Sequence, residues 1–217
     1  MNKKEKLKIF EKHLKMMKTK SIRMFTEYAI SKLPDYFWTL LASTTRKHHG
    51  ASETLIDHVQ GCLFIAEKVI QQFEGHWTDR QGDQLMSALI LHDGWRCGEP
   101  GKERRFTQED INEKGYPQEL LGELRTSRDH PEVGYQQLLS ISVDFNLKAQ
   151  EEKTERISAK NLQAILKGVR YHYGPWCRTK LRKPFSLSWP FDSVVMQVHN
   201  IDHMQMINAQ IWTREKE

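Results

Sequence analysis

The chain has 217 residues, of which 38% are hydrophobic and 28% charged, a composition typical of a soluble globular domain, and no apolar run reaches the roughly 20 residues that a membrane-spanning helix needs. The formal net charge of +5 is local, because residues 1–23 hold nine Lys or Arg against two Glu, so residues 24–217 hold 24 basic against 26 acidic side chains. These values exclude a membrane-spanning protein and a nucleic-acid-binding surface that extends over the whole fold.

The cysteines and the N-terminus both indicate a cytoplasmic protein. Cys62, Cys97 and Cys177 lie far apart in the sequence and leave an odd one over after pairing. The first residues, Met1 to Lys6, are charged and lack the apolar core of a secretory signal. Reduced thiols in a cytoplasmic compartment are the simplest interpretation.

Residues 1–35 are predicted to form a basic, amphipathic N-terminal helical segment. Leu7, Phe10, Leu14 and Met17 follow one another at spacings of three and four, which indicates one or two helices over residues 3–31. We expect this stripe to pack on the remaining domain, residues 36–217, while the lysines face water. Contact of the lysines with a nucleic-acid backbone or a membrane surface is the alternative interpretation.

Two amphipathic helices come next and each carries a histidine. The helix predicted over residues 52–73 places His58 beside Val59 on its apolar face. The next helix ends in an apolar run that leads directly to His92 and Asp93. This pair is either a solvated helix end capped by Gly94 or a pair of metal ligands, because both side chains are costly to bury without a partner.

The second half of the chain repeats this pattern. A loop region at 94–129, with short helices predicted near 108–113 and 118–126, leads to His130, which precedes Pro131 at a helix start. A helix from residue 158 carries His172 on its buried face, and residues 176–190 are predicted to form an ordered loop or hairpin. The last helix, 192–212, places Asp202 on its apolar stripe. No segment has a convincing strand pattern, so the fold class is all-α.

One shared cation would explain why so many histidines and carboxylates lie on apolar helix faces. These side chains are His58, His92, Asp93, His130, His172 and Asp202. The alternative is that each is an independently hydrogen-bonded core residue. A competing zinc pair, His199 with His203, has the right spacing of four but lies off the apolar stripe of its helix.

The order His, His-Asp, His, His, Asp on successive helices resembles the HD-domain superfamily of metal-dependent phosphohydrolases, over about residues 36–212. The stretches that carry the resemblance are 54–58, 89–93, 129–134, 171–174 and 198–202. The pair His48-His49 and the aromatic stretch at 36–38 are similar to an uncharacterised phage and bacterial subgroup. Two positions depart from the family pattern: Arg96 stands where a lysine is common, and Tyr173 where a second histidine is common.

The resemblance implies a single-domain HD-type helical bundle with a metal site in its core. It implies His58, His92, Asp93 and Asp202 as ligands of a first metal, with Asp93 shared between two metals. His130 and His172 would be second-site ligands or catalytic groups near the leaving oxygen, and Arg96 would join them as a catalytic and phosphate-binding residue. The donor types suit one or two divalent cations, namely Mn, Mg, Fe, Zn, Co or Ni.

Substrate contacts are expected outside the metal ligands. Basic side chains that would meet phosphate oxygens are Lys47, His48, His49, Arg96, Arg128, Lys180 and Arg182. Trp176 or Trp189 would stack on a base. Ordinary surface charges and core aromatic residues are the alternative interpretation of each.

The main hypothesis is therefore an enzyme that cleaves a phosphate ester or anhydride of a nucleotide, or a small phosphodiester, with metal-activated water. A second hypothesis is a 3′–5′ exonuclease acting on single-stranded nucleic acid. A third is a non-enzymatic helical module that binds nucleic acid or protein through the basic N-terminal helix. No membrane partner is expected.

Overall fold

The computed structural model describes residues 1–42, 54–173 and 193–214, with the side chains of residues 194–205 in the last range. Every regular element in these ranges is an α-helix or a 3-10 helix, and the β-type pairs that occur there are the isolated bridges Leu41–Thr54 and Arg105–Leu124. The all-α prediction is confirmed for this part of the chain. None of its helices is both long enough and apolar enough to cross a bilayer.

Several predicted substrate contacts lie outside the described residues. They are Lys47, His48 and His49, in residues 43–53, and Trp176, Lys180, Arg182 and Trp189, in residues 174–192. The loop or hairpin predicted for residues 176–190 also lies there.

The N-terminal segment forms three helices where one or two were predicted. They are α1 (Lys3–Ile9), α2 (Glu11–Met16) and α3 (Lys20–Lys32). The chain leaves α2 through Met17 in an extended conformation, which ends the helix before α3 begins. Phe10, Leu14 and Met17 are buried in the same hydrophobic core as the rest of the protein, so this segment is an integral part of the packed body.

A 3-10 helix, η1 (Asp35–Trp38), connects this segment to α4 (Leu55–Gln72). The Phe10 and Trp38 rings lie 6.2 Å apart, which packs the aromatic stretch against the N-terminal helices. Thr54 caps α4, because its hydroxyl accepts from the Asp57 backbone N–H while the Asp57 carboxylate accepts from the Thr54 backbone N–H. This capping box fixes the start of the helix that carries His58.

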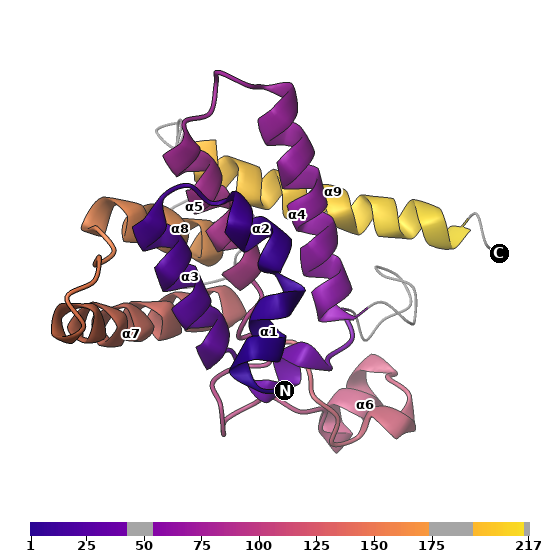
Figure 1. The fold of residues 1–217 in the computed structure, drawn as a ribbon. Helices are drawn as coiled ribbons and strands as arrows, with labels where there is room; N and C mark the ends of the chain where they lie inside the picture. Colours follow the sequence, from indigo (N-terminus) through magenta and orange to yellow (C-terminus); the bar gives the residue numbers. More distant parts are fainter. Residues whose placement is uncertain (43–53, 174–192, 215–217) are drawn as a thin grey trace.

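Helix α5 (Asp79–Leu91) is the central element, and α3, α4, α8 and α9 all pack against it (Figure 1). Every residue from Gly82 to Leu91 is buried. The polar side chains in this stretch have partners on neighbouring helices: Ser87 shares a 2.7 Å hydrogen bond with Thr26, and Gln84 donates to Asn161 at 3.0 Å. These bonds hold α5 in place as it delivers His92 and Asp93 to the middle of the molecule.

The loop region after α5 contains α6 (Gln108–Lys114) and a 3-10 helix, η2 (Gln118–Leu120). The prediction of a helix over residues 118–126 is wrong beyond residue 120, where η2 ends. Gly122 adopts φ = 82°, which a continuing α-helix cannot contain, and Leu124 bridges to Arg105 instead. The loop is closed by an ion pair between Arg125 and Asp110.

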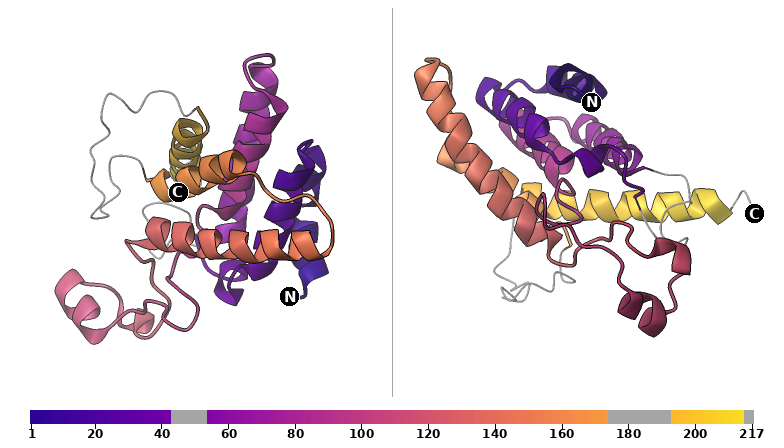
Figure 2. Two further views of the ribbon diagram at one scale, coloured as in Figure 1. Left: turned by 90° about the vertical axis from the view of Figure 1, so that its left-hand side faces the viewer. Right: turned by 90° about the horizontal axis from the view of Figure 1, so that it is seen from below.

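The C-terminal half consists of α7 (His130–Glu151), α8 (Ala159–Tyr171) and α9 (Ser193–Arg214). Helix α8 turns back against α7, and α9 packs across α8, α5 and α4 (Figure 2). Gly168 lies where α8 meets both α5 and α9, since an added Cβ would lie 2.8 Å from the Ala88 Cβ and 3.2 Å from a Val198 methyl. This close approach brings the ends of α5 and α8 together with α9.

Candidate metal centre

The side chains predicted to bind metal come together at the ends and faces of five helices. His58 belongs to α4, His92 and Asp93 follow α5, His130 begins α7, His172 follows α8 and Asp202 belongs to α9. The structure therefore brings all of them into one cluster. His92, His130 and His172 are completely buried, and the side chain of Asp202 is 17% exposed.

Three of the imidazoles are oriented by the same type of hydrogen bond. The Nδ1 atoms of His92, His130 and His172 each lie 2.7 Å from the backbone carbonyl oxygen three residues earlier. Because a carbonyl oxygen only accepts, each Nδ1 carries the hydrogen, and Nε2 of the neutral ring presents a lone pair. His92 and His172 are C-cap residues, so they use carbonyls that have no helical partner. The helix ends thus aim three ligand nitrogens into the cluster.

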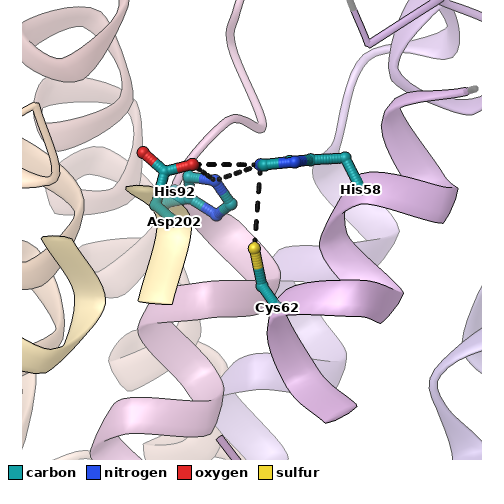
Figure 3. A group of neighbouring side chains, drawn as sticks. All are labelled: His58, Cys62, His92 and Asp202. Carbon is teal, nitrogen blue, oxygen red and sulfur yellow. Dashed lines mark hydrogen bonds and ion pairs between the residues drawn. The ribbon is translucent and has the colours of Figure 1, made fainter. Parts of the chain in front are cut away.

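The first half of the cluster, the Asp202 group, consists of His58, Cys62, His92 and Asp202 (Figure 3). Nε2 of His58 lies 3.3 Å from Nε2 of His92, 3.1 Å from Oδ1 of Asp202 and 3.7 Å from Sγ of Cys62. Nε2 of His92 lies 3.7 Å from the same carboxylate oxygen. The four ligand atoms all lie within 4.8 Å of one another, so one cation could contact all of them.

The second half, the Asp93 group, consists of Asp93, His130 and His172. Oδ1 of Asp93 lies 2.9 Å from Nε2 of His130 and 3.5 Å from Nε2 of His172, and the two nitrogens are 3.1 Å apart. Oδ2 of Asp93 lies 3.7 Å from Nε2 of His92, so this carboxylate joins the two groups.

Oδ1 of Asp93 provides a direct test of whether a cation fits. This oxygen is buried and accepts no well-oriented hydrogen bond from the described residues. It faces the lone pairs of two imidazoles whose hydrogens are on Nδ1. Lone pairs at this separation repel one another unless a proton or a cation lies between them. The donor set therefore fits a metal ion better than it fits a hydrogen-bonded core.

The charge balance of the cluster supports the same conclusion. Asp93 and Asp202 bring two carboxylates, and in the described part of the chain the guanidinium that pairs with them is that of Arg96, through Nη1 to Oδ2 of Asp93. Nε of Arg96 also donates to the Thr126 hydroxyl at 3.3 Å. One further positive charge is needed for neutrality, and in the metal-free protein the protonated His92 supplies it; a cation that displaces this proton would take over that role.

The pKa values show how the cluster adapts with no cation bound. Burial lowers the pKa of His92, but the Asp93 and Asp202 carboxylates outweigh burial and raise it to about 9. Burial raises the pKa of Asp93, yet Arg96 and His92 hold it well below its usual range. Burial lowers the pKa of both His58 and His172. His92 thus carries the proton that a cation would displace.

Arg96, one of the predicted phosphate contacts, is largely buried and pairs with a carboxylate of the cluster. Its side chain is 14% exposed and pairs with Asp93. Arg128 is exposed on the turn before α7, two residues from His130. These are the predicted substrate contacts that lie within the described residues.

The competing zinc pair is placed differently. Nδ1 of His199 donates to the backbone carbonyl oxygen of His172 at 2.6 Å, and the His199 and His203 rings stack with centroids 6.0 Å apart. Within the described residues neither ring belongs to the two groups of potential ligands. His199 instead supports the backbone of a residue that does.

Cys62 is the side chain of the cluster that sequence reasoning did not predict as a ligand. It lies on the apolar stripe of its helix among Val59 and Ala66, where a cysteine is normally a small core residue. The signal that was present is its spacing from His58. Residues four apart share one helix face, so a His and a Cys at this spacing can bind the same ion.

Comparisons with protein-family models, with curated proteins and with solved structures find no match to this chain.

Proposed function

We propose that this protein is a metal-dependent phosphohydrolase with an HD-type helical architecture, which cleaves a phosphate ester or anhydride of a nucleotide or a small phosphodiester. The observation that carries the proposal is the convergence of two ligand groups joined by one carboxylate, Asp93. Adjacent cation positions that share a carboxylate suit attack at phosphorus, where both the attacking and the leaving oxygen need charge stabilisation.

The residues of the Asp202 group would hold one divalent cation, and Asp93, His130 and His172 would hold a second. Bound cations would supply Lewis acidity, which lowers the pKa of water towards neutrality and offsets the charge that develops on the phosphoryl oxygens. Imidazole and carboxylate donors suit Mn, Mg, Fe, Zn, Co or Ni.

Three features of the chain would prepare this site for hydrolysis. The helix-end hydrogen bonds place the hydrogen of each neutral ring on Nδ1, so Nε2 of His92, His130 and His172 is the nitrogen directed into the cluster. In His92 a cation would displace the additional proton from Nε2. Arg96 keeps Asp93 ionised and oriented through its ion pair. At 14% exposure Arg96 also lies at the solvent edge of the cluster, where a phosphate oxygen could share its guanidinium.

The test is metal analysis of the purified chain, followed by phosphate release from nucleoside mono-, di- and triphosphates and small phosphodiesters with Mn, Mg, Co or Ni. We expect bound metal and release from at least one substrate. Asp93→Asn should remove both metal and activity, because it replaces the shared carboxylate by an amide. Asp144→Asn is the matched control, since Asp144 is exposed on α7. Equal activity in Asp93→Asn and the wild type would refute the mechanism.

Adding a single-stranded oligonucleotide to the panel, and measuring nucleic-acid binding, separates the alternative functions. Hydrolysis of a single-stranded oligonucleotide without hydrolysis of free nucleotides would favour the 3′–5′ exonuclease. Nucleic-acid binding through the basic segment is tested by replacing the exposed residues Lys3, Lys4 and Lys8 with Gln. Deletion of residues 1–23 is unsuitable for this purpose, because Phe10, Leu14 and Met17 are part of the core.

A further inference from the structure

The two halves of the cluster differ in one donor atom. The Asp202 group contains the sulfur of Cys62, whereas the Asp93 group offers nitrogen and oxygen only. Cys62 is completely buried one turn after His58 on α4, and Figure 3 shows its Sγ directed at Nε2 of His58. Since sulfur is a softer donor than nitrogen or oxygen, this difference affects which metal each half would select.

Four of the six separations between the ligand atoms are close to those around a single tetrahedral ion. An ion that holds nitrogen or oxygen at about 2.0–2.1 Å and sulfur at about 2.3 Å places two nitrogens about 3.4 Å apart and a nitrogen and a sulfur about 3.6 Å apart. The observed distances are 3.3 Å between the His58 and His92 Nε2 atoms and 3.7 Å between Nε2 of His58 and Sγ of Cys62. Oδ1 of Asp202 lies 3.1 and 3.7 Å from the two nitrogens, within about 0.3 Å of the separation around such an ion.

The packing of the helices supports a fixed position for this group. Helices α4 and α9 are in contact, and the end of the Gln205 side chain lies against Gly61, where an added Cβ would be 2.4 Å from it. Asp202 is one turn before Gln205 on α9. This packing brings the carboxylate to the helix face that carries His58 and Cys62.

We propose that Cys62 is a thiolate ligand, so that the Asp202 group is a sulfur-containing position selective for Zn, Co or Fe(II), while the Asp93 group is a sulfur-free position open to Mn or Mg. Binding at the first position breaks the S–H bond of Cys62 and releases its proton to solvent, while sulfur donates an electron pair to the cation. This inference rests on the metal binding in the proposed function, but not on its reaction.

The first test is addition of Co(II) to the metal-free full-length protein. A thiolate ligand produces a sulfur-to-cobalt charge-transfer absorption, which should be present in the wild type and absent in Cys62→Ser. Zinc binding, measured by competition with a chelator, should weaken by at least about 100-fold in this variant, since loss of even an outer-shell partner costs about 10–100-fold. The matched control is Cys97→Ser, which removes another buried thiol outside both groups and should retain the absorption.

A second measurement does not depend on a variant that folds. X-ray absorption of the zinc-loaded wild type should show one sulfur at about 2.3 Å among nitrogen and oxygen neighbours. A zinc shell without sulfur, or a charge-transfer absorption that persists in Cys62→Ser, would overturn the assignment of Cys62. If phosphate release persists in either case, the proposed function survives. If the wild type binds no metal at all, both proposals fail.

Discussion

Two regions of this protein gather charged side chains, and they differ in how far those charges are removed from water. In the N-terminal segment Lys12 pairs with Glu67 and Lys18 with Asp79, and the two lysine side chains are 66% and 70% exposed. In the candidate metal centre Asp93 is 4% and Asp202 17% exposed. Exposed ion pairs contribute little, whereas buried charges interact strongly and are costly to leave unbalanced.

The difference shows what holds each region in place. The N-terminal segment is attached by Phe10, Leu14 and Met17, which enter the common core, and its ion pairs lie at the rim of that contact. The candidate metal centre consists of buried imidazoles and carboxylates, so its stability depends on a correct balance of charge. Substitutions that change a charge should therefore affect stability and metal binding strongly in the candidate metal centre and weakly in the N-terminal segment.

The largest contrast is expected between two substitutions of the same type. Asp202→Asn should weaken binding of the first metal by at least about 100-fold and reduce phosphate release similarly, because it removes an anionic ligand. Asp79→Asn removes the exposed partner of Lys18. Its metal affinity and its rate of phosphate release should stay within about 2-fold of the wild type, as expected for a surface ion pair. The measurements are metal titration and phosphate release. Equal losses in the two variants would show that burial does not determine the effect.

The next largest effect concerns the apolar attachment of the segment. Phe10 is completely buried, so Phe10→Ala should lower the free energy of unfolding by about 3–5 kcal/mol through lost burial and a cavity. Urea denaturation followed by circular dichroism measures this change. Met16→Ala, at a residue of the adjacent helix that is 38% exposed, is the control and should have a much smaller effect. A loss below about 1 kcal/mol for Phe10→Ala would mean that the segment is only loosely packed.

The sequence was sufficient to predict most of the helices and the side chains that gather in the cluster, for a simple reason. Apolar residues at spacings of three and four are dictated by burial of one helix face, so a histidine or aspartate on that face has to lie inside. His58, His172 and Asp202 all fall in such patterns, and all lie in the cluster. The helix predicted over 118–126 failed because Gly122 takes a left-handed conformation, which the pattern does not reveal.

Other features of the site depend on contacts between helices and cannot be read from local patterns. The packing of α9 on α4 determines that Cys62 and Asp202 belong to one group, whereas within α4 the spacing of four from His58 does not by itself distinguish a ligand from a core residue. Arg96 was predicted as a phosphate contact from its position after Asp93. Its ion pair with Asp93, three residues earlier, forms in the turn that follows α5.

Metal-induced stabilisation should increase with pH. In the metal-free protein the pKa of His92 is raised from 6.5 to about 9, so its stabilising contribution is complete below pH 6.5 and is lost as pH rises through 9. A bound metal requires His92 without that proton, so the metal-loaded protein does not lose this contribution. The difference in unfolding free energy should widen by at most about 3 kcal/mol from pH 6.5 to 9.

The measurement is thermal unfolding of metal-loaded and metal-free protein across this pH range. His92→Gln is the control, because it cannot hold the proton and should flatten the dependence. If the difference in unfolding free energy between metal-loaded and metal-free wild type decreased as pH rises, displacement of the His92 proton by the metal would be contradicted.

Removal of Arg96 tests the charge balance at a smaller scale. Arg96→Ala leaves the carboxylates of the centre without their guanidinium, so the metal-free protein should lose about 2 kcal/mol of stability. Added metal should restore more stability in the variant than in the wild type, because the cation now meets less positive charge. The stability of metal-free Arg96→Lys should lie between those of Arg96→Ala and the wild type, because an ammonium keeps the charge but not the planar contact. A variant that metal stabilises less than the wild type would contradict this.

The smallest effect is expected at the rim of the N-terminal contact. Lys12→Ala removes the 2.6 Å pair with Glu67, but Lys12 is largely exposed, so the loss should stay below about 1 kcal/mol and decrease further in high salt. Urea denaturation at low and high salt measures it. Lys8→Ala, at an exposed lysine of α1, is the control for the general loss of positive charge. A loss as large as that of Phe10→Ala would show that charge attaches the segment, and the distinction between a region held by apolar contact and a region held by charge balance would no longer stand.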